Sequence, residues 1–296
     1  GAKRRSSVIN NERINDIYHS KNFFVEYFDL SDVSSINRLI SKYKPDEVYN
    51  LSCQSHVRVS YDVPEDTMNG IINGTLNILE AIKNINPETR FFNPSSSEMY
   101  GNSEMPRNGY NEESKFSPVS PYAIAKVAAH ELVKLYRNAY NLFVCNGILF
   151  NYESELRGET FVTKKITMAA AKIKLGKQEI LELGNLESSR DWGYAPEYME
   201  VIHEILQQDI PDDFVISTGE THKVQEFLEK VFECAEIENV YDYVRINQVY
   251  FRPCEVKHLM GDSSKIKKKL DWEPKTKFND VVKIMYKYDY EKIAKE

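Results

Sequence analysis

Short apolar segments alternate with segments of helical periodicity through the first half of this 296-residue chain. The apolar segments lie at residues 23–28, 47–51, 90–93 and 142–150. In each interval between them, apolar residues recur at the three- and four-residue spacing of a helix. Strands that alternate with helices of about ten or more residues are typical of a parallel sheet covered on both faces. The alternation therefore predicts an α/β protein built on a doubly wound parallel sheet.

The pattern changes at about Asn151, where the segments become shorter and more polar-aromatic. Beyond this point we expect a strand at 214–217, a helix at 224–234 and a last helix at 281–293. The sequence contains no low-complexity linker and no internal repeat. We therefore expect a Rossmann-like domain at residues 1–150. A smaller, interleaved C-terminal lobe at residues 151–296 would bind the substrate, with residues of about 213–236 returning to the sheet domain.

Composition excludes several classes of function. There are 38 basic against 45 acidic side chains, and this net charge of −7 argues against a nucleic-acid partner. No apolar stretch has the length of a transmembrane helix, and no secretion signal opens the chain. The four cysteines form no CxxC pair, and no HExxH pattern occurs. We therefore expect no membrane partner, no metal, and a reducing, cytoplasmic location.

Glycine-rich phosphate loops are missing from the sequence. The chain has 12 glycines and contains no GxGxxG, GxxGxxG or GxxxxGK pattern. Such loops use glycine because the backbone must approach a phosphate closely at the start of a helix. On its residues alone, the chain shows no phosphate-cradling loop.

Four predicted strand ends turn abruptly polar. They are Asp29-Leu30, residues 51–55, residues 95–98 and the residues from Asn151 onward. In sheets of this kind, ligands bind beyond the carboxyl ends of the strands. The coincidence at four successive strands is stronger evidence than any one motif, and we expect the functional site there.

A phenol and an ammonium group stand four residues apart at Tyr122 and Lys126, on one face of a helix that begins after Ser120-Pro121. A nearby cation stabilises the phenolate, whose unperturbed pKa is about 10, and so favours base chemistry near neutral pH. The spacing is common, and Tyr288 with Lys292 repeats it. The serine-rich strand end upstream of Tyr122 favours the first pair.

That strand end reads Ser95-Ser96-Ser97-Glu98. Its hydroxyls can satisfy backbone groups in a turn, and for Ser95 this role and a direct role in chemistry are equal alternatives. Three hydroxyls and a carboxylate can also orient a substrate hydroxyl and supply an acid or base beside Tyr122.

The chain resembles the GDP-mannose 4,6-dehydratases, a family of extended short-chain dehydrogenase/reductases. The resemblance runs in family order from Arg4 to about Lys275, nearly the whole chain. It rests on the segments at 4–7, 45–51, 54–57, 97–101, 120–123, 145–151, 158–163, 183–186, 190–193 and 251–253.

The resemblance implies a lyase that converts GDP-mannose to GDP-4-keto-6-deoxymannose with an NADP that is regenerated. Tyr122 would take the proton of the sugar 4-OH as hydride leaves C4, and Lys126 would lower the pKa of the phenol and hold the nicotinamide ribose. Glu98 would then remove the C5 proton. Ser96, where the family usually has threonine, would orient the sugar hydroxyls while water leaves from C6. The implied catalytic residues are therefore Ser96, Glu98, Tyr122 and Lys126.

Binding residues follow from the same resemblance. Those implied for NADP are Arg4, Arg5, Ser6, Ser7, Asp29, Leu30, Leu51, Ser52, Gln54, Ser55, Tyr122, Lys126 and Arg157. Those implied for the GDP-sugar are Ser97, Asn151, Thr160, Val162, Lys165, Gly184, Arg190 and Arg252. The two arginines of the second set suit the diphosphate. The guanidinium and hydroxyl groups at 4–7 suit the 2′-phosphate of NADP, and without the resemblance they would count as a basic surface.

Assembly is a further implication. Residues 4–13 match a family loop that reaches a neighbouring subunit's cofactor site, so we expect a homodimer or homotetramer. The chain departs from the family pattern at Tyr152, Leu156 and Asp66, which stand in place of a histidine, an arginine and an aromatic residue. Gly1 aligns near the end of the family's second strand. We expect that the glycine-rich turn before it exists in the intact protein.

Two other functions stay open. One is a dehydratase or epimerase of another nucleotide sugar, such as a GDP-heptose or a UDP- or dTDP-hexose. Glu98 favours dehydration, because the epimerases of the superfamily lack this base. The other is a truncated, non-catalytic homologue that binds a sugar nucleotide, against which the complete set of Ser96, Glu98, Tyr122 and Lys126 argues.

Overall fold

A four-stranded parallel sheet forms the centre of the larger domain in the computed structural model, which describes residues 1–7 and 11–296. Its order is β10–β5–β4–β3, and the strands are β3 (Glu47–Tyr49), β4 (Arg90–Ser96), β5 (Val144–Leu149) and β10 (Phe214–Ile216). Phe92 of β4 pairs with Tyr49 on one side and with Cys145 on the other. β5 and β10 are buried along their whole length, as expected for strands covered on both faces. The predicted α/β class and parallel sheet are confirmed.

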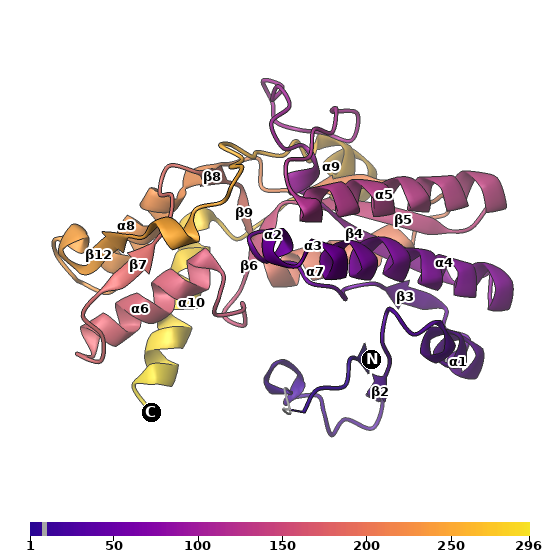
Figure 1. The fold of residues 1–296 in the computed structure, drawn as a ribbon, viewed down its shortest axis with the longest axis horizontal. Coiled ribbons are helices and arrows are strands. Elements are labelled where there is room, and N and C mark those ends of the chain that lie inside the picture. The colour runs from indigo at the N-terminus through magenta and orange to yellow at the C-terminus, as the bar shows by residue number, and fades with distance from the viewer. Residues whose placement is uncertain (8–10) are drawn as a thin grey trace.

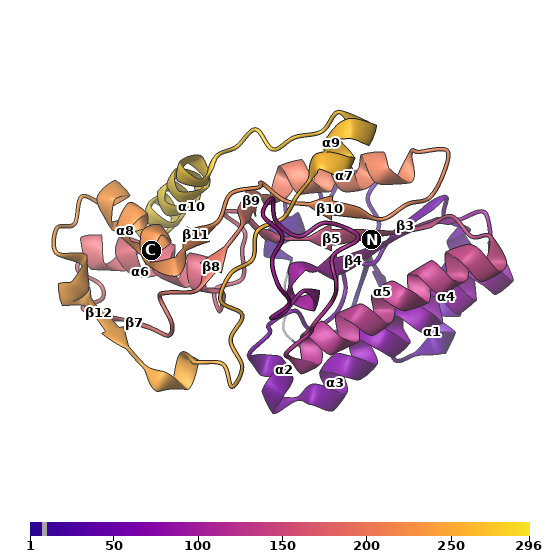
Figure 2. The ribbon, with the colours of Figure 1, turned by 90° about the horizontal axis from the view of Figure 1, so that it is seen from above.

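Helices cover both faces of this sheet (Figure 2). On one face lie α1 (Val33–Tyr43), α4 (Gly74–Ile85) and α5 (Pro121–Tyr140), and on the other lie α7 (Ala195–Leu206) and α9 (Ser264–Leu270). Phe91 packs with Ile82 on the first face, and Phe92 packs with Ile202 on the second. Successive side chains of a strand point to opposite faces, so one strand contributes to both layers.

Local sequence signals set where these helices begin. The Asp32 carboxylate accepts a hydrogen bond of 3.0 Å from the Ser34 amide at the start of α1. At the start of α5, the Ser120 hydroxyl accepts one of 3.1 Å from the Ala123 amide, and Pro121 occupies the first turn. Both are the N-terminal capping arrangement that satisfies free amide groups. Tyr122 is thereby placed in the first turn of α5.

The segment before α4 is more broken than the periodicity predicts. It consists of α2 (Val59–Asp62), α3 (Pro64–Met68) and one π-helical turn (Asn69–Asn73). Pro64 stands in the first turn of α3, where its missing N–H costs no hydrogen bond. Short 3₁₀ turns occur at Glu12–Ile14, Ser97–Met99, Val240–Tyr243 and Gln248–Tyr250.

The N-terminal segment forms its own parallel pair of strands, β1 (Ala2–Lys3) and β2 (Glu26–Tyr27). This pair lies near α1 in Figure 1. Arg38 of α1 donates a hydrogen bond of 2.9 Å to the Tyr27 carbonyl, and Lys42 forms an ion pair of 2.6 Å with Glu26. The apolar run at 23–28 therefore yields a strand of only two residues.

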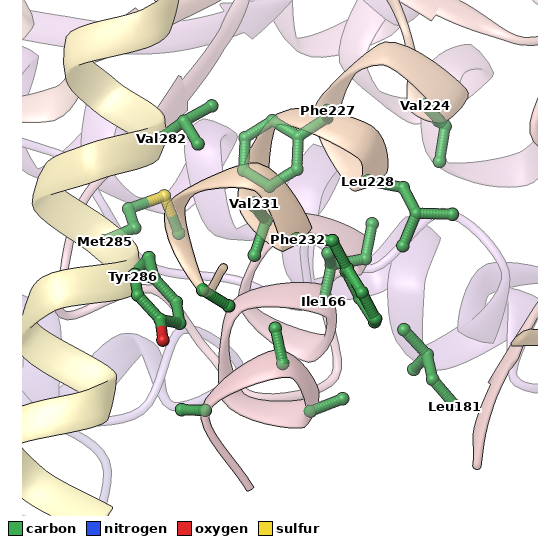
Figure 3. Close-up of a cluster of buried hydrophobic side chains, with 14 of the residues drawn as sticks. Ile166, Leu181, Val224, Phe227, Leu228, Val231, Phe232, Val282, Met285 and Tyr286 are labelled. Carbon is green, nitrogen blue, oxygen red and sulfur yellow. The ribbon is translucent and has the colours of Figure 1, made fainter. Parts of the chain in front are cut away.

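The second lobe has its own core. Its helices are α6 (Val162–Lys174), α8 (Val224–Cys234) and α10 (Phe278–Ile293), and its short strands are β6 (Asn151–Glu153), β7 (Leu181–Leu183), β8 (Ser189–Arg190), β9 (Trp192–Tyr194), β11 (His222–Lys223) and β12 (Val244–Ile246). The strands pair as β6 with β9, β7 with β12 and β8 with β11. Phe227 and Phe232 of α8 belong to the buried cluster that α6, α8 and α10 form together (Figure 3).

The two parts of the chain interleave more than a boundary at residue 150 would imply. β10 pairs with β5, and α7 and α9 cover the sheet, so three later segments join the first domain. Of the expected returning segment 213–236, only the strand does so, because the apolar face of α8 is buried against α6 and α10. Asp191 stands at a crossing between the parts and accepts hydrogen bonds from the amides of Thr218, Gly219 and Gly261. Within the described residues, no helix has the length and apolar character needed to cross a bilayer.

Candidate active site

A cavity of about 340 Å³ lies between the carboxyl ends of β3, β4 and β5 and the second lobe. The sheet domain contributes residues 51–53 and 55–58, residues 94–98 and the first turn of α5. The second lobe contributes residues from 151 onward, among them Gly184, Arg190 and Arg252. Three of the four strand ends singled out by the sequence therefore meet in one cavity. Asp29 and Leu30 do not line it.

Most of the expected site residues line this cavity. All four expected catalytic residues and all eight expected sugar-nucleotide residues do so. Of the expected cofactor residues, those that line it are Leu51, Ser52, Ser55, Tyr122, Lys126 and Arg157.

The other expected cofactor residues lie apart from the cavity. Arg4, Ser6 and Ser7 are exposed, as is Arg5, whose guanidinium donates a hydrogen bond of 3.0 Å to the Tyr27 hydroxyl. The Asp29 carboxylate accepts hydrogen bonds from the amide and hydroxyl of Ser31 and interacts electrostatically with Arg4. The pKa of Asp29 lies below its ordinary value, mainly because of the hydrogen bonds from Ser31 and to a smaller extent because of the charge of Arg4.

Gln54 and Leu30 are held by structural contacts. The Gln54 amide donates a hydrogen bond of 3.1 Å to the Thr67 hydroxyl and accepts one from the His56 amide. The side chain of Leu30 packs against Gly74 at the start of α4, where a Cβ would lie 3.0 Å from Leu30 Cδ1. Gly74 therefore allows the close approach of α4 and the loop after β2.

Tyr122 is buried, and burial raises the pKa of its phenol well above the ordinary value. Nearby Cys53 and Glu98 act in the same direction as burial, because a negative charge disfavours a phenolate. A hydrogen bond with Ser96 and the charge of Arg157 act in the opposite direction. In this arrangement Tyr122 is a protonated phenol at neutral pH.

Lys126 is also buried, but its ammonium is directed elsewhere. The Nζ atom donates a hydrogen bond of 2.6 Å to the Pro94 carbonyl and lies 5.7 Å from the centre of the Tyr122 ring. The sequence led us to expect a Tyr122 pKa lowered by Lys126. The pKa is raised instead, because burial of the phenol, reinforced by Cys53 and Glu98, outweighs the hydrogen bond with Ser96 and the charge of Arg157. The second YxxxK match lies on α10, where Lys292 forms an ion pair with Glu12.

Glu98 is buried between two arginines. Its Oε1 atom lies 3.2 Å from Arg252 Nη1 and 3.7 Å from Arg190 Nη2. Burial alone would raise the pKa of this carboxyl, but the charges of Arg252 and Arg190 hold it below its ordinary value. Glu98 is therefore a carboxylate at neutral pH, which is the protonation state of a general base.

Ser95 takes the structural alternative. Its hydroxyl lies 2.9 Å from His130 Nδ1 and donates a hydrogen bond of 3.3 Å to Asn146 Oδ1. Burial is the main reason that the pKa of His130 is lowered, so this network is uncharged near neutral pH. Ser96, by contrast, accepts a hydrogen bond of 3.2 Å from the Glu98 amide and contacts Tyr122.

Two carboxylates of the cavity were missed by the sequence reasoning. Glu255 lies 3.3 Å from Arg190 and 3.6 Å from Arg252. Glu153 is buried and accepts a hydrogen bond of 2.6 Å from the Thr163 hydroxyl. A signal existed for each, since Glu255 stands three residues after Arg252, and Glu153 shares a strand face with Asn151.

The three departures from the family pattern differ in their surroundings. Tyr152 lines the cavity, and its ring centre lies 5.6 Å from that of Tyr198. Leu156 is exposed, and its carbonyl accepts a hydrogen bond of 3.0 Å from Arg13. Asp66 is exposed on α3. Among the described residues, no group of three or more His, Cys, Asp or Glu side chains is placed to hold a metal ion.

Solved structures place the fold among nucleotide-sugar dehydratases and epimerases. The structure of RMD from Pseudomonas aeruginosa complexed with NADPH matches with a TM-score of 0.81 and 21% identity over 95% of both chains. DesIV, a dTDP-glucose 4,6-dehydratase from Streptomyces venezuelae solved with NAD and TYD, matches with a TM-score of 0.85 and 17% identity over 99% of this chain and 87% of that one. These similarities concern the fold.

Sequence relatives give the family. The family model for GDP-mannose 4,6 dehydratase matches residues 1–285. GDP-mannose 4,6 dehydratase 2 of Arabidopsis thaliana is 47% identical over all of this chain and 81% of its own length. GDP-mannose 4,6-dehydratase of Sinorhizobium fredii is 44% identical over 98% of this chain and 88% of its own. This chain belongs to the GDP-mannose 4,6-dehydratase family, as its sequence motifs led us to expect.

Proposed function

We propose that this chain converts GDP-mannose to GDP-4-keto-6-deoxymannose and water, with a bound NADP. The observation that carries the proposal is the meeting of Ser96, Glu98 and Tyr122 on one wall of the cavity, in a chain of this family. The reaction needs one base at the sugar 4-OH and a second at C5. Tyr122 and Glu98 are two such groups in different electrostatic surroundings.

Tyr122 is the group that exchanges a proton with the 4-OH of the sugar. Its pKa is raised by burial, so the phenolate needs a closer positive charge than the described arrangement supplies. Lys126 stands one helical turn away, and its ammonium donates a hydrogen bond to the Pro94 carbonyl. Movement of the ammonium toward the phenol oxygen would stabilise the phenolate.

Glu98 is the base that removes the C5 proton, which a 4-ketone makes acidic. It is ionised already, and it lies at the carboxyl end of β4 beside Ser96. The Ser96 hydroxyl contacts Tyr122 and accepts a hydrogen bond from the Glu98 backbone amide, so it can orient a sugar hydroxyl beside the phenol. The proton that Glu98 takes from C5 would leave with the C6 hydroxyl as water. The proton that Tyr122 takes from the 4-OH would balance the one that C5 regains in the 6-deoxy product.

The residues present suit a nicotinamide dinucleotide in their donor chemistry. Arg4 and Arg5 follow β1 as exposed guanidinium groups, and Ser52, Ser55, Lys126 and Arg157 line the cavity. Arg4, Arg5, Ser6 and Ser7 would hold the 2′-phosphate, and Lys126 the nicotinamide ribose. When bound, NADP would accept a hydride from C4 and return it to C6. Gln54 and Leu30 would contribute through the shape of their loops, because their side chains are engaged in structural contacts.

The substrate side of the proposal uses residues of the second lobe. Arg190 and Arg252 would bind the diphosphate, and Asn151, Thr160, Val162, Lys165 and Gly184 would surround the sugar and nucleoside. A Cβ at Gly184 would lie 2.9 Å from the Tyr250 carbonyl, so only glycine allows the described packing of this cavity wall.

Assembly and location are part of the same proposal. A homodimer or homotetramer is expected from the family loop at 4–13, of which residues 8–10 lie outside the described residues. Within one chain, Arg13 donates to the Leu156 carbonyl and Glu12 pairs with Lys292. A monomer in light scattering with NADP bound would contradict the proposed assembly. Four free cysteines support the proposed cytoplasmic location.

Incubation of the full-length protein with NADP and GDP-mannose tests the function. Mass spectrometry should show a product that has lost one water, and reduction with borodeuteride should label it at C4. Parallel incubations with GDP-heptose, UDP-glucose and dTDP-glucose test the substrate. Conversion of one of these in place of GDP-mannose would overturn the assignment.

A further inference from the structure

Glu98, Arg190, Arg252 and Glu255 form one ion cluster on the cavity wall. Arg252 lies 3.2 Å from Glu98 and 3.6 Å from Glu255, and Arg190 lies 3.7 Å and 3.3 Å from the same two carboxylates. Two positive charges are thus balanced by two negative ones. In a partly buried site such a balance removes the cost of an unpaired charge.

The two carboxylates come from different parts of the chain but contact the same nitrogen of each arginine, Arg190 Nη2 and Arg252 Nη1. Arg190 also donates hydrogen bonds of 2.9 Å to the carbonyls of Ser189 and Val256, and Val256 is the neighbour of Glu255. Arg252 and Glu255 are three residues apart in the same segment. Glu98 belongs to the other part of the molecule, at the end of β4, and both of its arginine contacts use one oxygen atom, Oε1. When Glu98 is released, Arg190 therefore keeps Glu255 and two carbonyls, and Arg252 keeps Glu255.

The cluster gives the arginines two competing tasks under the proposed function. The substrate's diphosphate needs Arg190 and Arg252, and these are the groups that pair with Glu98. A carboxylate that is paired with two guanidinium groups is a weaker base than a free carboxylate, because the positive charges stabilise its ionised form. If the diphosphate replaces Glu98 beside the two arginines, the substrate is bound and Glu98 at the same time becomes a stronger base.

We propose that Glu98 is an internal counterion which the substrate's diphosphate displaces from Arg190 and Arg252, and that Glu255 is the positioning residue that keeps both guanidinium groups in place after the exchange. This inference rests on the proposed function and deepens it. The base at C5 becomes fully active only when the diphosphate is seated. Nucleotide sugars are thereby distinguished from free sugars at the chemical step.

Calorimetric titration of GDP into the NADP-saturated protein tests the exchange without turnover. Glu98→Gln should bind GDP about tenfold more tightly than the wild type, because one charge-assisted contact no longer has to be broken. Glu255→Gln removes the same charge from the same cluster, yet it should weaken GDP binding by about tenfold, because the arginines lose their support while Glu98 still competes.

The opposite signs separate this inference from a general charge effect. Tighter binding in both variants would show simple relief of repulsion, and unchanged binding in Glu98→Gln would show that no exchange occurs; either result overturns the proposal. Thermal melts establish that the variants fold. Should Glu255→Gln fail to fold, Glu255→Asp keeps the charge with a shorter reach, and weaker binding is expected again.

The same preparations separate this inference from the reaction itself. Dehydration of GDP-mannose by the wild type, with no gain of GDP affinity in Glu98→Gln, refutes the exchange alone. If Glu98→Gln gains GDP affinity but the wild type forms no 4-keto sugar from GDP-mannose, the proposed reaction alone is refuted.

Discussion

The ammonium group of Lys126 on α5 donates a hydrogen bond of 2.6 Å to the carbonyl of Pro94 on β4. This contact ties the second turn of the helix to the strand that ends in Ser96 and leads to Glu98. Tyr122 lies one turn earlier on α5, and its phenol reaches Ser96. One hydrogen bond thus joins the helix that carries Tyr122 to the strand that leads to Glu98.

Replacement of the two proposed bases should stop the reaction at different stages. Tyr122→Phe removes the group that takes the 4-OH proton, so no reduced nicotinamide should form after GDP-mannose is added. Glu98→Gln keeps this step but lacks the C5 base, so reduced nicotinamide and a 4-keto hexose should accumulate. Each change should lower turnover by about 10²–10⁴-fold, the usual contribution of a general acid or base. Single-turnover absorbance at the reduced-nicotinamide band measures both.

Thermal melts of both variants provide the control for this experiment. A purely structural role predicts that both proteins lose stability and bind substrate poorly. If Glu98→Gln releases 6-deoxy product at the wild-type rate, Glu98 is not the elimination base. If Tyr122→Phe still forms reduced nicotinamide rapidly, Tyr122 is not the group that starts the reaction.

The exposed arginines after β1 should set the choice of dinucleotide. Arg4 and Arg5 offer charge-assisted hydrogen bonds to a 2′-phosphate, which NAD lacks. The wild type should therefore bind NADP more tightly than NAD, and Arg5→Ala should lose most of this preference with little change in NAD affinity. Fluorescence titration of both dinucleotides measures the two affinities. Arg38→Ala, on the adjacent α1, is the matched control, and equal affinities in the wild type would contradict the assignment.

Asp191 should make folding stability depend on pH in a narrow acidic range. Burial raises the pKa of this carboxyl from 3.8 to about 6, although hydrogen bonds from Thr218 and two backbone amides act against the shift. The folded state therefore binds the proton more tightly than the unfolded state. The stability contributed by the protonated group is complete below about pH 4 and is lost as the pH rises through 6. The full change is about 3 kcal/mol, at roughly 1.4 kcal/mol for each pKa unit.

Asp191→Asn should remove this pH dependence and lower stability at every pH. Its carboxylate accepts from the amide and hydroxyl of Thr218 at one oxygen, and from the amides of Gly219 and Gly261 at the other. An asparagine can accept at only one of these atoms, which leaves buried donors unpaired at a cost of about 1–3 kcal/mol. Urea unfolding between pH 4 and 7 measures both effects, with the exposed Asp271→Asn as control. An unchanged pH profile would argue against a raised pKa at Asp191.

The buried ion pair between α6 and α10 should matter far more than an exposed pair on the same helix. Lys164 pairs with Asp289, and Thr167 donates a hydrogen bond of 2.6 Å to the same carboxylate. Lys164→Met should cost about 3–5 kcal/mol of unfolding free energy, because it leaves Asp289 charged and buried. Lys174→Met removes the exposed pair with Glu236 and should cost less than about 1 kcal/mol.

A double variant checks the physical reason for that difference. Lys164→Met combined with Asp289→Leu removes both charges, so it should recover most of the stability that Lys164→Met loses. Urea unfolding of the wild type, Lys164→Met, Asp289→Leu and the double variant measures the coupling. Equal losses in the single and double variants would mean that packing, and not the unpaired charge, accounts for the effect.

Local and periodic features of this protein could be predicted from its residues. The helix that begins at Ser120-Pro121 and the strand before Ser95 follow from capping and apolar periodicity, which depend only on neighbouring residues. The family motifs led to Ser96, Glu98, Tyr122 and Lys126, which line one cavity.

The sequence did not predict which elements pack against each other over long distances in the chain, as the second lobe demonstrates. The segment at 224–234 was expected to be a helix, and it is, but its apolar face packs on α6 and α10 and not on the sheet. An amphipathic pattern specifies that a face is buried and leaves its partner open. The strand at 23–28 shortened to two residues for a similar reason, since a strand is as long as its pairing partner allows.

The electrostatics of the site depend on distances between charged groups in space, and these distances cannot be read from spacings along the chain. Lys126 and Tyr122 share a helix face, yet the ammonium is engaged by Pro94 and burial raises the pKa of the phenol. Glu98 and Arg252 are 154 residues apart in sequence and share a hydrogen bond. Glu255 enters the cluster only because the second lobe folds against the end of β4. A residue's type and neighbours in sequence identify the groups that can ionise, whereas burial and the charges brought near by folding set which of them do so.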